Sequence, residues 1–244
     1  MCRVCGCGDE VGHSHDAGHH HDHNHPQTRR ISLETDLLAK NDRLATALRD
    51  RLVHDQIAAF NLIGAPGAGK TTLLEHTIRA LADISISVIE GDQATDNDAR
   101  RIAATGCRVV QVNTGAGCHL DATMIERGLA ELAPSARSLV LVENVGNLVC
   151  PALFDLGERA KIVVMSVTEG EDKPLKYPHV FRAASVLVLT KADLLPHVDV
   201  DPARCIENAR RINPNLEVFP VSATRGNGLA EWCGWLRAQI GGAR

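Results

Sequence analysis

The chain has 244 residues, of which 44% are hydrophobic, and a formal net charge of −4. This length and composition predict one main globular domain with appendages, and the lack of a basic stripe argues against a nucleic-acid partner. No apolar run reaches the roughly 20 residues of a membrane span, and the first residues lack a signal-peptide core, so we expect no membrane association. Eight cysteines that fit no disulfide framework indicate a reducing, cytoplasmic environment.

Residues 1–28 are rich in cysteine, glycine, histidine and aspartate and almost free of large apolar side chains. Such a segment cannot build a core, so we expect a flexible metal-binding tail. Three thiols within six residues can wrap one cation, and a fourth donor must be the terminal amine, a backbone amide or a tail histidine. These N,S donors favour square-planar Ni²⁺ over a four-cysteine zinc site. The candidate ligands are Cys2, Cys5 and Cys7.

Seven histidines follow in the same tail, interrupted by aspartate and asparagine. An expression tag would be an uninterrupted run, so the pattern indicates a natural tract that binds several divalent ions weakly. We expect this tract to store metal, and its members are His13, His15, His19, His20, His21, His23 and His25.

Leucines recur between Ser32 and His54 at steps of three and four residues among charged side chains. This spacing predicts an amphipathic helix, either continuous or broken near Asn41. We therefore assign residues 29–55 to an amphipathic helical segment and residues 56–244 to a separate domain.

Residues 56–244 alternate between strand-like and helix-like segments. The predicted strands are 57–63, 86–90, 109–112, 138–143, 161–167, 185–190 and 217–221, and the predicted helices are 71–82, 96–105, 121–132, 202–212 and 229–240. Runs that are apolar on both faces are typical of central parallel strands covered by helices. The pattern predicts a doubly wound α/β domain with a mostly parallel sheet and its ligand at the carboxyl ends of the strands.

A phosphate-binding loop follows the first predicted strand. Residues 64–71 read G-A-P-G-A-G-K-T, which matches G-x-x-x-x-G-K-[ST] in the required strand–loop–helix context. Its glycines let backbone N–H groups point at one anion, Lys70 reaches the terminal phosphates, and the Thr71 hydroxyl faces Mg²⁺. The motif predicts a nucleoside triphosphate site with Lys70 as a catalytic residue, and the nucleotide-binding residues are Gly64, Gly67, Ala68, Gly69, Lys70, Thr71 and Thr72.

Two later loops indicate which base is bound. Residues 190–193, T-K-A-D, resemble the guanine-reading [NT]-K-x-D loop, in which the Asp193 carboxylate accepts from two guanine donors that adenine lacks. We therefore expect GTP rather than ATP. Lys191 would lie along the base plane, and Ser222 and Ala223 fit the loop that supports the base oxygen. Thr190 stands where asparagine is commoner, so we expect slightly weaker base binding.

Two acidic residues are candidates for holding Mg²⁺ and for catalysis. Glu143 begins the E-x-x-G segment 143–146, in which a carboxylate can hold the ion and Gly146 can approach the γ-phosphate. Asp92 ends an earlier strand, although a plain turn acid is the alternative interpretation. We expect Thr71, Asp92 and Glu143 to bind Mg²⁺. Because Asn147 replaces the usual water-orienting glutamine, we expect slow hydrolysis.

A second set of metal donors lies within the same domain. Cys118 and His119 follow one strand, and Cys150 lies seven residues after Glu143. Both loops leave the carboxyl edge of the sheet, so the three donors can converge. An adjacent cysteine and histidine chelate poorly alone, and a donor from Cys150 or a second subunit is needed.

Other residues receive structural interpretations. We interpret Arg100 and Arg101 as a solvated helix face, and Trp232 and Trp235 as anchors of the last helix to the core. Three further thiols, Cys107, Cys205 and Cys233, are expected to be small buried apolar residues.

Together these motifs resemble the HypB family, GTPases that help to insert nickel into [NiFe]-hydrogenase. The likeness rests on C-x-x-C-G-C, the histidine tract, G-A-P-G-A-G-K-T-T, E-G-D, T-G-A-G-C-H, E-N-V-G-N-L-V-C-P and K-x-D. The family is similar to other metal-delivery GTPases that act as nucleotide-linked dimers. The UreG family of urease nickel GTPases is less similar, because it has Cys-Pro-His where this chain has Cys118-His119.

The resemblance implies a GTP-hydrolysing nickel chaperone that binds GTP and GDP and forms a nucleotide-dependent homodimer. It implies tight nickel binding by the tail cysteines and a weaker Ni²⁺ or Zn²⁺ site at the dimer interface, formed by Cys118, His119 and Cys150. It also implies two partners, the hydrogenase large subunit and an accessory nickel chaperone, and a role for Lys173 at the nucleotide of a second subunit. The alternative is a nickel storage protein whose GTPase domain serves only dimerisation, because the histidine tract is oversized for delivering one ion.

Overall fold

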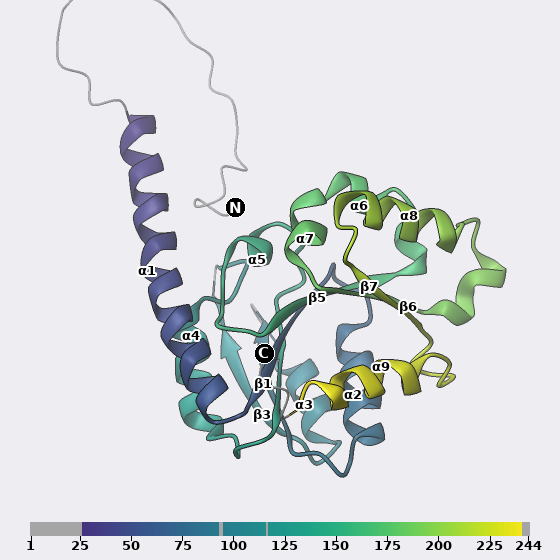
Figure 1. Cartoon of the computed structure of the whole chain (residues 1–244), viewed down its shortest axis with the longest axis horizontal. Helices are drawn as coiled ribbons and strands as arrows, with labels where there is room; N and C mark the ends of the chain where they lie inside the picture. The colour runs from purple at the N-terminus through teal and green to yellow at the C-terminus, as the bar shows by residue number, and fades with distance from the viewer. Residues whose placement is uncertain (1–25, 93–94, 116, 241–244) are drawn as a thin grey trace, which may run out of the picture.

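A single sheet of seven parallel strands, in the order β3-β2-β4-β1-β5-β6-β7, forms the centre of the protein (Figure 1). The computed structural model describes residues 26–92, 95–115 and 117–240, so the predicted ligands in the tail, cysteines and histidines alike, lie outside the described residues. The strands are β1 Ala58–Ile63, β2 Ile86–Asp92, β3 Arg108–Asn113, β4 Leu139–Glu143, β5 Ala160–Ser166, β6 Val186–Thr190 and β7 Glu217–Val221.

Helices cover both faces of this sheet. One face packs against α2 Lys70–Ala80, α3 Asn97–Ala103 and α9 Leu229–Ala238, and the other against α1 Pro26–His54, α4 Ala122–Leu132, α5 Cys150–Leu153, α7 Pro178–Ala183 and α8 Pro202–Ile212. Three shorter elements are α6 Lys173–Lys176 and the 3₁₀ turns η1 Val167–Glu169 and η2 Ala192–His197. The predicted doubly wound α/β fold is therefore confirmed, and every strand pair is parallel.

Alternation along the strands explains this layering. In β1, Phe60 and Leu62 face the α2 side, whereas Ala59 faces the α4 side, and all three are buried. Successive side chains of a strand point to opposite faces, so strands covered on both sides are apolar throughout. Trp232 anchors α9 to this core as predicted: it is 1% exposed, and its indole N–H donates to the Thr77 hydroxyl at 2.9 Å.

Helix α1 is continuous through Asn41, so the alternative of a break there is wrong. The buried Asn41 amide donates to the Asp155 carbonyl at 2.8 Å and accepts from the Ala122 N–H at 2.9 Å, which fixes it to the domain instead of to its own backbone. The helix begins at Pro26, inside the segment predicted as tail, and its N-terminal part extends away from the other elements (Figure 1).

Helix α1 packs on a turn that contains Gly157. This glycine has a φ of 78°, and a Cβ added to it would lie 2.8 Å from both the Ala45 carbonyl oxygen and Leu48 Cβ. The neighbouring Asp155 carboxylate accepts from the Arg49 guanidinium and from the Gly157 N–H. Glycine is therefore required both by the backbone conformation and by the close approach of the helix.

Within the described part of the chain, no helix has the length and apolar character to cross a membrane.

Candidate functional site

The phosphate loop links the buried end of β1 to the first turn of α2. Gly67 and Gly69 adopt positive φ values of 74° and 93°, which aim the loop backbone at the helix N-terminus. Gly64 passes so close to β5 that a Cβ would lie 2.3 Å from the Val164 carbonyl oxygen. The buried Lys70 ammonium donates to the Gly64 carbonyl at 3.3 Å, and it therefore spans the concave side of the loop.

A cavity of about 500 Å³ opens in front of this loop. Its walls include most of the predicted phosphate and Mg²⁺ residues, namely Gly67, Gly69, Lys70, Thr71, Thr72, Asp92, Glu143, Gly146 and Lys191. These residues come from the start of α2, from the end of β2 and from the segments that follow β1, β4 and β6, so the carboxyl edge of the sheet brings them together as predicted.

Glu143 has the environment of a cation ligand. Its side chain is 3% exposed, one carboxylate oxygen accepts from the Thr71 hydroxyl at 2.8 Å, and the other is buried without a hydrogen-bond partner. Burial raises the pKa of Glu143 to about 7, against the opposing effects of Lys70 and Thr71. A buried carboxylate oxygen of this kind fits a hard cation such as Mg²⁺, with Thr71 as its neighbouring oxygen donor.

Asp92 lies at the rim of the same cavity, where its carboxylate accepts from the N–H and the hydroxyl of Thr95 at 3.3 and 2.8 Å. The turn-acid interpretation therefore describes its present contacts. Because Asp92 lies on the cavity wall, its role as an Mg²⁺ ligand stays a prediction.

Sequence reasoning missed Glu90, a third acidic side chain of this cavity. It is 2% exposed, has one carboxylate oxygen without a partner, and pairs in register with Glu143 across β2 and β4. Burial, followed by repulsion from Glu143 and Asp92, raises its pKa to about 8. The sequence feature that could have indicated Glu90 is an acidic residue within a predominantly apolar strand, where a charged side chain is costly to bury.

Arg101 also contributes to the cavity, which the interpretation as a solvated helix face did not predict. Arg100 is exposed and pairs with Asp96, as expected of such a face. The Arg101 guanidinium is partly exposed but donates to the Thr72 hydroxyl at 3.0 Å and to Glu75 at 2.6 Å. It therefore ties α3 to the phosphate-loop helix.

A second, adjoining cavity of about 260 Å³ lies at the ends of β6 and β7. Thr190, Lys191, Asp193 and Ala223 line it. The buried Ser222 hydroxyl donates to Asp193 at 2.6 Å, and this bond lowers the pKa of the carboxyl group. The predicted base-reading residues therefore converge on one cavity, with Asp193 held as an acceptor.

Thr190 and Lys191 additionally brace the phosphate loop. The Thr190 hydroxyl lies 2.5 Å from the Ala68 carbonyl and 3.2 Å from that of Met165, and the Lys191 ammonium donates to the Gly67 carbonyl at 2.8 Å. Thr190 thus links β6 to the phosphate loop, whereas its effect on base affinity stays a prediction.

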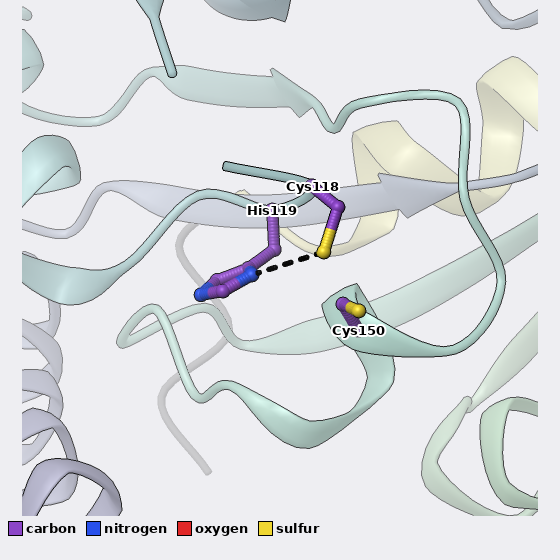
Figure 2. Close-up of side chains that lie close together, drawn as sticks. All are labelled: Cys118, His119 and Cys150. Carbon is purple, nitrogen blue, oxygen red and sulfur yellow. Dashed lines mark hydrogen bonds between the residues drawn. The ribbon is translucent and has the colours of Figure 1, made fainter. Parts of the chain in front are cut away.

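The second predicted metal site also comes together. The donor atoms of Cys118, His119 and Cys150 all lie within 4.8 Å of one another, and Cys118 Sγ is 3.7 Å from His119 Nδ1 (Figure 2). The two cysteines are not joined in a disulfide. The His119 ring stacks on Phe154 with ring centroids 3.8 Å apart. Burial lowers the pKa of His119, against the raising effect of Asp121, and so favours the neutral imidazole that binds metals.

The other thiols lie outside this group. Cys205 and Cys233 are buried as predicted, and burial raises the pKa of each to about 11. Cys107 is only half-buried, which differs from the prediction, because it directly precedes β3, the strand at one edge of the sheet.

Comparison with known proteins identifies the family of this chain. The sequence profile described as "CobW/HypB/UreG, nucleotide-binding domain" matches residues 58–220. The "Hydrogenase maturation factor HypB" of Rhizobium leguminosarum bv. viciae is 54% identical over 211 residues, which cover 86% of this chain and 71% of that protein. The chain belongs to the HypB family.

Solved HypB structures share the fold. The crystal structure of HypB from Archaeoglobus fulgidus superposes with a TM-score of 0.77 at 39% identity, covering 82% of this chain and 98% of that one. HypB from Helicobacter pylori, crystallised in complex with nickel, superposes with a TM-score of 0.77 at 34% identity, covering 82% and 94%.

Lys173 of this HypB-family chain lies away from the phosphate cavity of its own subunit. Its ammonium pairs with Glu169 at 2.9 Å and lies 5.2 Å from the centroid of the Tyr177 ring. It is absent from the cavity wall, so a role at a nucleotide requires a second copy of the chain.

Proposed function

We propose that this chain is a GTP-hydrolysing nickel chaperone that assists nickel insertion into [NiFe]-hydrogenase. One observation carries the proposal: the segment from Glu143 to Cys150 borders the phosphate cavity at its first residues and contributes to the Cys-His-Cys cluster at its last. Family membership supports it, because relatives are named hydrogenase maturation factors and one solved HypB holds nickel.

Each part of the nucleotide site has a distinct task in this proposal. Lys70 and the backbone N–H groups of the phosphate loop hold the phosphates, and Asp193 reads guanine. Thr71, Glu143 and Asp92 would hold Mg²⁺, which supplies charge neutralisation on the transferring phosphoryl group. Asn147 replaces a water-orienting glutamine, so we expect slow intrinsic hydrolysis that a single-turnover assay on dilute protein can measure.

Nucleotide state controls nickel binding in this mechanism. A γ-phosphate contacting Gly146 shifts the loop that carries Cys150 relative to Cys118 and His119. Nickel affinity then differs between the GTP and GDP states, which defines a coupling between two sites. The cluster supplies three donors, and the fourth comes from a second subunit in a GTP-dependent homodimer, with Ni²⁺ or Zn²⁺ as the ion.

The decisive experiment is nickel titration of the full chain with Cys2, Cys5 and Cys7 replaced by alanine. This background removes the predicted cysteine site of the tail and leaves Cys118, His119 and Cys150 beside the weakly binding histidine tract, whose contribution should be the same in both nucleotide states. Nickel affinity should differ by roughly fivefold or more between GDP and a non-hydrolysable GTP analogue. Equal affinities in the two states would remove the switch. Light scattering on the same samples tests the predicted dimer.

Nickel storage by the histidine tract is a further role in this proposal. The tract lies outside the described residues, so it rests on the sequence alone. Deleting residues 13–25 separates storage from delivery. Storage predicts a hydrogenase defect only when nickel is scarce, and a defect in plentiful nickel would show instead that the tract takes part in delivery.

A further inference from the structure

Two asparagines of the loop between β4 and α5 bond to the backbone at the Cys118-His119 pair and directly after it. The Asn147 amide donates to the Cys118 carbonyl at 3.4 Å. The Asn144 side-chain oxygen accepts from the Leu120 N–H at 3.3 Å. Both bonds run from the phosphate-sensing loop to the loop that carries two of the three metal donors.

Asn144 is a fixed point of this arrangement. It is 1% exposed, its amide donates to the Asn61 side chain on β1 at 3.1 Å, and its backbone N–H donates to the Leu62 carbonyl at 3.0 Å. Its side-chain oxygen is shared between the Leu120 and Val145 N–H groups. This side chain therefore holds the start of the loop to the central strand.

Asn147 connects three segments at once. Its backbone forms an antiparallel bridge with Gly64, the first residue of the phosphate loop. Its side-chain oxygen accepts from the Val149 N–H at 2.9 Å, directly before Cys150, while its amide reaches Cys118. An asparagine can do this because its side chain both donates and accepts.

Gly146 makes the same loop sensitive to the phosphate site. A Cβ at this position would lie 2.8 Å from Pro66 Cγ, so the two loops are in close contact. Gly146 precedes Asn147 directly. A shift of Gly146 toward a γ-phosphate therefore moves Asn147, whose bond to Cys118 is already near the outer limit for a hydrogen bond.

We propose that Asn147 is the positioning residue that links nucleotide state to the nickel donors, with Asn144 as its buried pivot. This inference rests on the proposed function and identifies the residues that couple the nucleotide site to the nickel site. The hydrogen bond from Asn147 to the Cys118 carbonyl forms only when Gly146 is in one of its two positions. The distance between Cys118 and Cys150 therefore changes when the nucleotide changes. Without the bond, Cys118 takes the same range of positions in both states.

The test compares nickel affinity with GDP and with a non-hydrolysable GTP analogue, in full-length protein that lacks the three tail cysteines. Asn147→Asp keeps the acceptor for the Val149 N–H but loses the donor to Cys118. The readout is the ratio of the two affinities, which cancels the part of any charge effect that is common to both states. Asn147→Ser repeats the measurement, and the GDP affinity of each variant verifies its fold.

Asn113→Ala is the matched control. The Asn113 side chain accepts from the Gly115 N–H at 2.7 Å. Removing this side chain loosens the start of the loop that carries Cys118 and His119 and leaves the loop between β4 and α5 unchanged. The parent ratio should be about fivefold or more, should fall to about one in both Asn147 variants, and should persist in Asn113→Ala.

Each other outcome overturns a different statement. An unchanged ratio in the Asn147 variants rejects this inference and leaves the proposed switch standing. Loss of the ratio in Asn113→Ala as well would mean that any loosening of the metal loop suffices, which rejects the specific role of Asn147. A ratio of one in the parent rejects both the switch and the inference.

Discussion

The nucleotide cavity and the Cys-His-Cys cluster share one edge of the sheet but differ in how complete they are. In the nucleotide site, Lys70, Thr71 and Asp193 are each fixed by a hydrogen bond from this same chain. The cluster offers three donors, two on the loop after β3 and one at the start of α5, although a tetrahedral or square-planar ion takes four. The first site is ready to bind its ligand, whereas in the proposed function a donor from outside the subunit completes the second. In the absence of nickel, changes in the cluster should therefore leave nucleotide affinity intact, while nucleotide state should alter nickel affinity.

Asp193→Asn should have the largest effect and should be confined to the nucleotide side of this comparison. An asparagine amide cannot accept from both guanine donors, so GTP affinity should fall by roughly 100-fold or more. Binding of a xanthine nucleotide, which has a carbonyl in place of the amine, should improve. Competition binding with the two nucleotides measures this. A loss of nucleotide-free nickel affinity at the internal site would contradict the separation of the two sites.

Cys150→Ala tests the reverse direction. Removing one of three donors should lower nickel affinity at the internal site by about 100-fold, because thiolates are strong ligands for this ion. GDP affinity measured without nickel should stay within about twofold, since Cys150 does not line either nucleotide cavity. Cys107→Ala is the control, because this thiol lies outside the cluster. Equal nickel binding by the two variants would remove Cys150 from the site.

Thr190→Val tests the separation of the nucleotide site from the cluster with almost no change in side-chain volume. The change removes the hydroxyl that bonds to the Ala68 carbonyl, and a net loss of about 0.5–1.5 kcal/mol corresponds to roughly 2–13-fold weaker GTP binding. Nickel affinity without nucleotide should not change. Unaltered GTP affinity, measured by fluorescence titration, would show that this bond does not support the phosphate loop.

Glu90→Gln should affect stability more than binding. Burial raises the pKa of Glu90 to about 8, so the folded protein keeps a proton that the unfolded chain releases at lower pH. The unfolding free energy therefore falls as pH rises toward 8, and glutamine removes this loss.

Thermal melts of nucleotide-free Glu90→Gln measure this effect. The melting temperature should exceed that of the parent by about 2–4 °C near pH 8.5, the shift expected for about 1 kcal/mol, and by less near pH 5.5. The exposed Glu131→Gln serves as the control. A gain that is equal at both pH values would argue against a protonated Glu90.

Sequence predicted the sheet and its ligand edge well, because the strands are apolar on both faces and the phosphate loop is contiguous. The seven predicted strands and the five helices predicted in residues 56–244 begin and end within two residues of the observed elements, whereas α1 begins earlier than predicted. Three helices of four to six residues, α5, α6 and α7, were missed since they are too short to show a helical period. The convergence of Cys150 with Cys118 followed from their shared sheet edge.

Other parts of the site depend on pairings that sequence does not display. Glu90 meets Glu143 only through the register of β2 with β4, two strands separated by β3 along the chain. Asn144 and Asn147 belong to the E-N-V-G-N-L-V-C-P segment, but nothing in the sequence indicates their hydrogen bonds to the loop that carries Cys118. The tail ligands and the domain boundaries stay predictions.

The seat of α1 on Gly157 gives experimental access to the N-terminal region. One methyl group at this position would strike the helix backbone at Ala45 and also force an unfavourable φ. Gly157→Ala can therefore undock the leading helix while every proposed ligand keeps its chemical identity. The variant makes it possible to ask whether nickel passes between the predicted tail ligands and the internal cluster only when that helix is docked.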